Sequence, residues 1–212
     1  MKTGVLFDLD GVLIDSESIY TEFWADIDRL YPTGVDDFAH IIKGSTLPKI
    51  LDTYFPEADK QHDILRRISD FEKSMVYRPF PEAMRFVDQL NANGIGCAVV
   101  TSSSKQKMDN LYAQNPSFRN CFKAVITSDV VTHSKPHPEP YLLGAEALGI
   151  EASQCFVFED SLSGIESGIA AGATVIGLAT TLPLSEITGK AHKTITSFAG
   201  FSIADMLSTK RG

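Results

Sequence analysis

Apolar residues along this chain are spaced in two different ways. Residues 5–7 are consecutive apolar residues of the kind that forms a short buried strand. Beyond residue 15, apolar residues instead recur every three or four positions, which is the spacing of one face of a helix. The clearest of these positions are Ile19, Phe23, Ile27, Leu30, Ile64, Ile68, Phe71 and Met75. The pattern predicts one strand followed by a small group of helices over residues 16–76.

From Pro81 onward the pattern changes to short apolar strands that alternate with helices. We predict strands at residues 97–100, 124–127, 156–158 and 175–178, and helices at residues 81–93, 105–114, 138–148 and 163–171. Short strands separated by helices of about ten residues are typical of a doubly wound parallel sheet with right-handed crossovers.

We therefore predict an α/β fold in two parts. Residues 1–15 and 80–212 form a Rossmann-like core, and residues 16–79 form an α-helical cap inserted after the first strand. The length of 212 residues allows one core domain with an inserted subdomain. The prolines Pro79 and Pro81 break the helical pattern where the chain returns to the core.

Composition narrows the class of protein. The net charge is −8 and no basic run is present, so nucleic acid is not an expected partner. No stretch approaches ~18 apolar residues, so we expect no membrane span. Cys97, Cys121 and Cys155 are odd in number and widely spaced, which predicts reduced thiols in a cytoplasmic protein. A monomer is the default expectation for this architecture.

Polar residues stand at the ends of the predicted strands. Asp8 ends the first apolar run and Asp10 follows two residues later, so in extended chain both side chains point the same way. Gly11 then allows a tight turn. Taken alone, the two aspartates could equally be turn residues that cap the next helix.

Similar polar residues follow the other strands. They are Thr101, Lys135 in a later loop, Glu159 and Asp160. In a doubly wound sheet these ends converge on one crevice, where several carboxylates would repel one another. A hard divalent cation relieves that repulsion, and oxygen-only ligands favour Mg²⁺. Thr101 and Lys135 suit a phosphate oxygen, so the pattern indicates phosphoryl transfer with one carboxylate as nucleophile and a second as acid and base.

These residues lie in four short motifs that resemble those of the haloacid dehalogenase superfamily of phosphohydrolases. The motifs are Asp-Leu-Asp-Gly-Val at residues 8–12, Val-Val-Thr at 99–101, Ser-Lys-Pro at 134–136 and Phe-Glu-Asp-Ser at 158–161. The chain is similar to the β-phosphoglucomutase-like group of this superfamily, in which a helical cap follows the first strand. The first and fourth motifs are specific, and the resemblance covers essentially the whole chain.

The resemblance implies a role for each acidic residue. Asp8 would be the nucleophile and a ligand of Mg²⁺. Asp10 would be the general acid and base and would contact the metal through its backbone carbonyl. Asp160 would ligate Mg²⁺. Glu159 would either ligate the ion as well or hold the ligating residues in position without contacting it.

The resemblance also implies which residues hold the phosphorylated substrate. Thr101 and Lys135 would bind the transferring phosphoryl group, although Ser102 is an alternative to Thr101 because three serines follow it. Further substrate contacts are expected from Gly11, Ser102, Ser103, Lys43 and Gly44.

Two flanking histidines and Lys135 itself have simpler interpretations. A lysine before a proline is most often a solvated loop residue, and the other motifs are what reverse that interpretation here. His133 and His137 lack a cysteine or second histidine at ligand spacing, so we interpret them as loop histidines and not as metal ligands.

Three functions are compatible with these residues: a Mg²⁺-dependent phosphatase of a small phosphorylated metabolite, a sugar-phosphate mutase, and a non-catalytic phosphate-binding protein. A mutase needs a cation in the cap for a second phosphate. Aligned with the β-phosphoglucomutase pattern, Leu47 replaces the cap arginine and Tyr20 the cap histidine, although Lys43 and Lys49 could compensate. We therefore favour the phosphatase. The binding protein ranks last because every catalytic position holds a competent residue.

Overall fold

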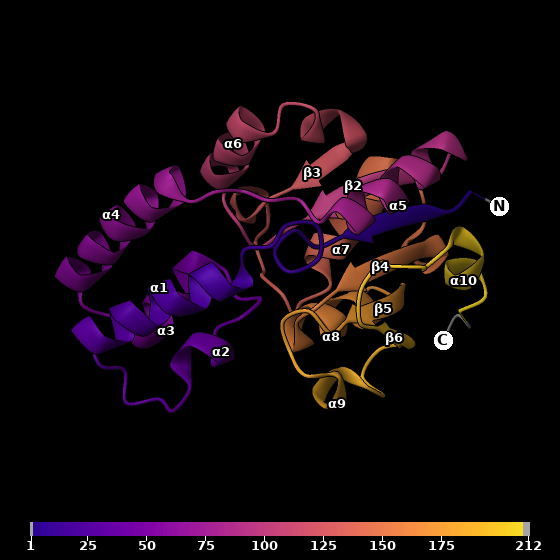
Figure 1. Cartoon of the computed structure of the whole chain (residues 1–212). Helices are drawn as coiled ribbons and strands as arrows, with labels where there is room; N and C mark the ends of the chain where they lie inside the picture. Colours follow the sequence, from indigo (N-terminus) through magenta and orange to yellow (C-terminus); the bar gives the residue numbers. More distant parts are fainter. Residues whose placement is uncertain (1, 210–212) are drawn as a thin grey trace.

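A six-stranded parallel sheet forms the centre of the molecule. The computed structural model describes residues 2–209, and its strands lie in the order β3-β2-β1-β4-β5-β6, all pairs parallel (Figure 1). The strands are β1 (Gly4–Phe7), β2 (Gly96–Val100), β3 (Ala124–Ile126), β4 (Cys155–Glu159), β5 (Thr174–Leu178) and β6 (Lys193–Ile195). This arrangement confirms the predicted doubly wound α/β fold.

Helices cover both faces of this sheet. They are α5 (Pro81–Ala92), α6 (Lys105–Gln114), α7 (Glu139–Leu148), α8 (Leu162–Ala170), α9 (Leu184–Ile187) and α10 (Ile203–Leu207), with 3-10 turns η1 (Phe118–Cys121), η2 (Ser128–Val130) and η3 (Ala152–Gln154). Alternate residues of β1 enter opposite layers: Phe7 packs in the layer that contains Phe86 of α5, and Leu6 in the layer that contains Tyr141 of α7. Burial on both faces explains why β1 reads as a continuous apolar run.

Four helices inserted between β1 and α5 have an apolar core of their own. They are α1 (Glu17–Leu30), α2 (Phe38–Ile41), α3 (Leu47–Tyr54) and α4 (Ala58–Ser74), and they lie to one side of the sheet (Figure 1). Trp24, Phe38 and Ile64 are among the residues buried in this second core. We keep the name cap for residues 16–79, and their division from the core at residues 15 and 80 stays a prediction.

The chain enters and leaves the cap through two adjacent segments. The amide of Asp15 donates to the carbonyl of Arg78 at 2.9 Å, and the amide of Phe80 donates to the carbonyl of Leu13 at 2.9 Å. The two connections therefore form a short paired ribbon between the cap and the sheet.

The sequence pattern missed the last part of the sheet. β6 has only three half-buried residues at the edge, so it lacks the apolar run that marks the other strands. Within residues 2–209, no helix has both the length and the apolar character needed to cross a membrane.

Candidate active site

The candidate site begins at the carboxyl end of β1, at the point where the strand order reverses. Asp8 follows β1 directly. Phe7 is in register with Val99 on one side and Phe158 on the other, and the Asp8 amide donates to the Phe158 carbonyl at 3.0 Å. In open α/β sheets, ligands bind in the crevice outside the strand ends at this reversal point.

Asp160 reaches the same crevice from β4. Gly11 turns the chain with a φ of 72°, and a Cβ at this glycine would overlap the Asp160 carboxylate. Only a glycine therefore lets the turn after Asp10 approach Asp160. The Asp160 carboxylate also accepts a hydrogen bond from the hydroxyl of Thr181.

A cavity of about 510 Å³ lies between the sheet edge and the cap. Eight of the residues predicted from the sequence line it, and they come from both parts of the chain: Asp8, Asp10, Lys43, Gly44, Thr101, Ser102, Ser103 and Asp160. Lys135 and Glu159 lie behind its wall, and Gly11 forms the turn beside it. The expected convergence of strand ends is therefore present, with two of the residues one layer deeper.

Lys135 is buried, with only 1% of its surface exposed, so it is not a solvated loop lysine. Its Nζ donates to Asp8 Oδ1 at 2.6 Å, to Glu159 Oε1 at 2.6 Å and to the carbonyl of Val100 at 3.1 Å. Burial alone would lower the pKa of Lys135, but the two carboxylates outweigh it and raise the pKa. Lys135 is thus held as a cation directly against Asp8.

Both oxygens of Glu159 are occupied by protein donors. Oε1 accepts from Lys135 and, at 2.9 Å, from the hydroxyl of Tyr141. Oε2 accepts from the amides of Asp160 and Ser161 at 3.0 Å and from the Ser161 hydroxyl at 2.9 Å. Of the two expected roles, this geometry favours support: Glu159 fixes Lys135 and the loop after β4. Whether Glu159 also ligates a metal directly stays a prediction.

Asp8 and Asp10 have opposite electrostatic environments. Burial raises the pKa of Asp8 to about 8, against the attraction of Lys135 and with help from the Glu159 and Asp10 carboxylates. Burial would also raise the pKa of Asp10, but Lys107 and the hydroxyl donors around it lower that pKa below its ordinary value. Carboxylates with diverging pKa values can serve as the separate reactive groups of one mechanism.

Lys107 is a residue of the candidate site that was not predicted from the sequence. It lies on α6, is buried, and its Nζ donates to Asp10 Oδ1 at 2.5 Å. The same Nζ lies 4.1 Å from the centre of the Tyr20 ring in the cap. One signal was present: Lys107 lies beside the buried Met108 and four residues before the buried Leu111, on the inward face of the helix.

Two serine hydroxyls complete the surroundings of Asp10. The Ser16 hydroxyl donates to Asp10 Oδ1, and the Ser103 hydroxyl donates to Asp10 Oδ2 at 2.8 Å. Ser16 begins the cap segment and Ser103 follows β2, so Asp10 is bonded to both parts of the chain. These donors stabilise the ionised form of Asp10.

The ambiguity between Thr101 and Ser102 can be addressed from their hydrogen bonds. The Ser102 hydroxyl donates to the carbonyl of Gly44 in the cap at 2.9 Å. Thr101 Oγ1 accepts from the Ser103 amide at 3.0 Å, and a hydroxyl that accepts one bond can still donate its own proton. The geometry therefore favours Thr101 as the residue whose hydroxyl donates a hydrogen bond to the phosphate. Ser102 instead contacts the cap.

The side chains of the site suit a hard cation. Asp8, Asp10 and Asp160 offer oxygen atoms only, and Glu159 adds a fourth carboxylate against the two ammonium groups of Lys107 and Lys135. Burial, with smaller contributions from the Glu159 and Asp10 carboxylates, raises the pKa of Asp8, so a further positive charge would favour its ionised form. Oxygen donors and uncompensated negative charge are the conditions under which Mg²⁺ binds well.

Comparison with known proteins defines the class. The sequence profile described as haloacid dehalogenase-like hydrolase matches residues 2–172, so the chain belongs to this family of hydrolases. The prediction that it is an enzyme of this superfamily is confirmed.

Three curated relatives can be named. Hexitol phosphatase A of Escherichia coli is 31% identical over 186 residues, which cover 82% of each chain. Fructose-1-phosphate phosphatase YqaB of Escherichia coli is 29% identical, over 82% of this chain and 94% of the relative. Protein SUPPRESSOR OF QUENCHING 1 of Arabidopsis thaliana is 31% identical over 85% of this chain, which spans only 18% of that longer protein.

Solved structures share the same fold. A family IA HAD hydrolase from Entamoeba histolytica superposes with a TM-score of 0.82 at 25% identity, over 98% of each chain. β-Phosphoglucomutase from Clostridium difficile superposes with a TM-score of 0.80 at 18% identity, over 99% of this chain and 97% of that one. The latter likeness concerns the fold alone.

Proposed function

We propose that the protein is a Mg²⁺-dependent phosphatase that hydrolyses a small sugar phosphate through an aspartyl-phosphate on Asp8. One observation carries this proposal: Asp8 lines the cavity with the buried Lys135 against it, while Asp10, two residues away, is held in the ionised form. The names of the two Escherichia coli relatives, a hexitol phosphatase and a fructose-1-phosphate phosphatase, support a sugar phosphate as the substrate.

In the first step a carboxylate oxygen of Asp8 attacks phosphorus and the ester P–O bond breaks. Lys135 and Thr101 bind the phosphoryl oxygens. The protonated fraction of Asp10 gives its proton to the leaving alcohol oxygen, which leaves Asp10 in its favoured ionised form. Asp8, Asp160 and the Asp10 carbonyl would hold Mg²⁺, and the bound ion would reduce the repulsion between the phosphate and the carboxylates.

In the second step the ionised Asp10 takes a proton from water. The resulting hydroxide attacks phosphorus, and the bond between phosphorus and Asp8 breaks to release inorganic phosphate. Lys107, Ser16 and Ser103 stabilise the ionised form of Asp10, which is the form that this step requires. The site is therefore arranged for hydrolysis of the intermediate.

A sugar-phosphate mutase is the second candidate, because Lys43 lines the cavity from the cap side and could hold a second phosphate. The two positions at which the sequence departs from the mutase pattern argue against it. Tyr20 donates to Glu72 at 2.7 Å and packs over Lys107, so it is part of the internal support of Asp10. Leu47 adds an apolar side chain to the cavity lining.

Phosphate release from a panel of sugar and nucleotide phosphates, measured with Mg²⁺, tests the proposal. We expect release from sugar phosphates in the intact protein and loss of at least ~1,000-fold in Asp8→Asn, which removes the nucleophile but preserves the side-chain volume. In parallel, β-glucose 1-phosphate with a trace of bisphosphate is assayed for isomerisation. Isomerisation faster than phosphate release would replace the phosphatase by the mutase, and full activity of Asp8→Asn would remove Asp8 from its role.

A further inference from the structure

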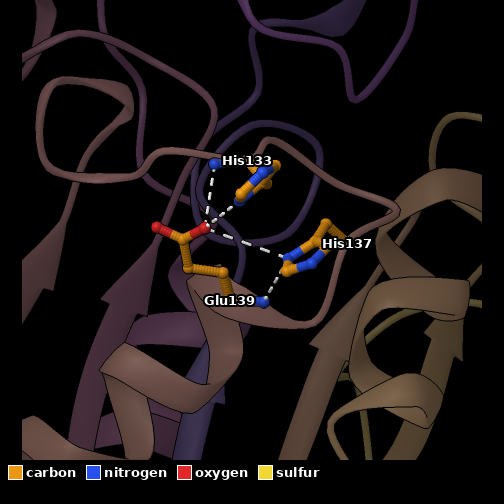
Figure 2. A group of neighbouring side chains, drawn as sticks. All are labelled: His133, His137 and Glu139. Carbon is orange, nitrogen blue, oxygen red and sulfur yellow. Dashed lines mark hydrogen bonds and ion pairs between the residues drawn. The ribbon is translucent and has the colours of Figure 1, made fainter.

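A second cluster of ligand-forming side chains lies outside the cavity, on the loop that carries Lys135. His133 Nδ1 lies 2.8 Å from Glu139 Oε2, and His137 Nδ1 lies 3.9 Å from the same oxygen (Figure 2). The centres of the two imidazole rings are 4.4 Å apart. One candidate ligand atom from each residue lies within 4.8 Å of the others.

We propose that His133, His137 and Glu139 form a binding site for a borderline transition-metal cation such as Zn²⁺. Two imidazoles and one carboxylate are a known ligand set for zinc, with bonds of about 2.0–2.2 Å and a fourth position left to water. Ligands of one tetrahedral ion lie ~3–4 Å apart, so small side-chain rotations bring the three atoms into place. Imidazole nitrogens also select zinc over Mg²⁺, which prefers oxygen.

Two of the three residues, Glu139 and His137, have contacts that an ion would not disturb. Two other contacts involve candidate ligand atoms: the His133 amide donates to Glu139 Oε2 at 2.9 Å, and the Glu139 amide donates to His137 Nδ1 at 3.2 Å. Glu139 Oε1 accepts from the Thr132 amide at 2.6 Å, which fixes the carboxylate against the loop. The His137 amide donates to the Ser134 carbonyl at 3.0 Å, and the His137 carbonyl accepts from the Ser167 hydroxyl at 2.6 Å. Outer contacts of this kind orient ligands and strengthen metal binding.

The proposed site is separate from the catalytic one. The Lys135 side chain points inward and is buried, whereas the His133 and His137 side chains are 60% and 48% exposed. The loop thus presents a catalytic lysine to the cavity and two histidines to the solvent. From the sequence, His133 and His137 were interpreted as loop histidines because neither has a cysteine or second histidine at ligand spacing. Glu139, whose carboxylate lies close to both rings, supplies the third ligand atom.

The competing explanation is an ordinary ion pair between Glu139 and a protonated His133, with no metal involved. Calorimetric titration of the full-length protein with ZnCl₂ at pH 7.5, in excess Mg²⁺, separates the two. We expect the intact protein to bind one more equivalent of Zn²⁺ than the double variant His133→Gln/His137→Gln. Excess Mg²⁺ occupies the oxygen ligands of the catalytic site, and any zinc that still binds there is common to both proteins.

The control is His62→Gln, because His62 is an exposed histidine on α4 outside this cluster. We expect it to bind as many equivalents as the intact protein. In addition, Zn²⁺ at ~100 times its Kd raises Tm by about 5–10 °C in the intact protein and in His62→Gln, relative to the double variant. Equal stoichiometry in the intact protein and the double variant overturns the proposal.

Loss of folding in the double variant is covered by a second variant. Glu139→Gln removes the charge but keeps an oxygen that accepts from the Thr132 amide. We expect it to weaken zinc binding at least tenfold and to keep its phosphatase activity with Mg²⁺. Because that activity is measured in the same preparation, failure of the zinc site and failure of the proposed phosphatase function are distinguishable. Unchanged zinc affinity in a folded Glu139→Gln variant also contradicts the site.

Discussion

Substitution of Gly44, a cap residue that contacts the core, tests whether the cap must close over the cavity for activity. Gly44 has a φ of 77°, and its carbonyl accepts from the Ser102 hydroxyl. A Cβ at this position would lie 2.6 Å from Ser161 Oγ and closer still to Ser163 Oγ. Replacement by alanine therefore adds a methyl group where the cap turn meets the loop after β4.

The expected magnitude follows from two separate effects. Alanine in the left-handed region costs about 1 kcal/mol, whatever surrounds it. The overlap adds about 1–3 kcal/mol, because Ser161 cannot turn away freely: its hydroxyl donates to Glu159 and accepts from the Gly164 amide at 3.1 Å. Only the second effect opposes seating of the cap on the core. We therefore expect kcat/KM of Gly44→Ala to fall about 5- to 150-fold.

Gly34→Ala is the matched control. Gly34 is also in the cap, has a φ of 72°, and has no atom within 4 Å of a built Cβ. It shares the backbone strain of the first variant without the overlap, so we expect similar loss of Tm but nearly unchanged kcat/KM. Steady-state phosphate release and thermal unfolding are measured on both variants. If the two kcat/KM values agree within twofold, the cap does not act through this contact and the reasoning is refuted.

Two further predictions concern the charges around Asp10 and Asp8. Lys107→Met removes the cation that lowers the pKa of Asp10. We therefore expect the acidic limb of the pH–rate profile to move to higher pH and kcat near pH 6 to fall ~10-fold or more. An acidic limb at the same pH in the variant and the intact protein contradicts this prediction. Burial raises the pKa of Asp8 to about 8, so at pH 6.5 the folded, metal-free protein holds a proton on Asp8 that the unfolded chain has lost. The free energy of unfolding of the metal-free protein therefore falls as the pH rises from ~4 to ~8. Mg²⁺ binding then releases about one proton per ion at pH 6.5 and few above pH 9, as measured by calorimetry in buffers of different ionisation enthalpy; no release at pH 6.5 contradicts it.

The sequence was sufficient for features that local patterns determine. The apolar run at residues 5–7 identified β1, and the polar residues after β1, β2 and β4 identified the edge at which Asp8, Thr101 and Asp160 meet. The end of a strand is visible in the local sequence, and a parallel topology places all strand ends of one kind at the same edge of the sheet. Their convergence can therefore be predicted without knowing any individual contact.

Contacts between distant segments were not predictable in the same way. Lys107 is 97 residues from Asp10 in sequence, and a lysine in a helix is by default a solvated residue. The role of Glu159 depended on how many protein donors reach each oxygen, which only the fold reveals. β6 was missed because an edge strand of three half-buried residues carries no apolar run.

The paired ribbon at residues 13–15 and 78–80 has a consequence for how new specificities can arise. Because the two connections lie side by side, the 62 residues between them could be shortened, lengthened or exchanged for another module with little effect on the sheet. Much of the cap can thus vary without a change in the sheet or in the residues at its edge, provided that Ser16 and Tyr20, which support Asp10, are retained.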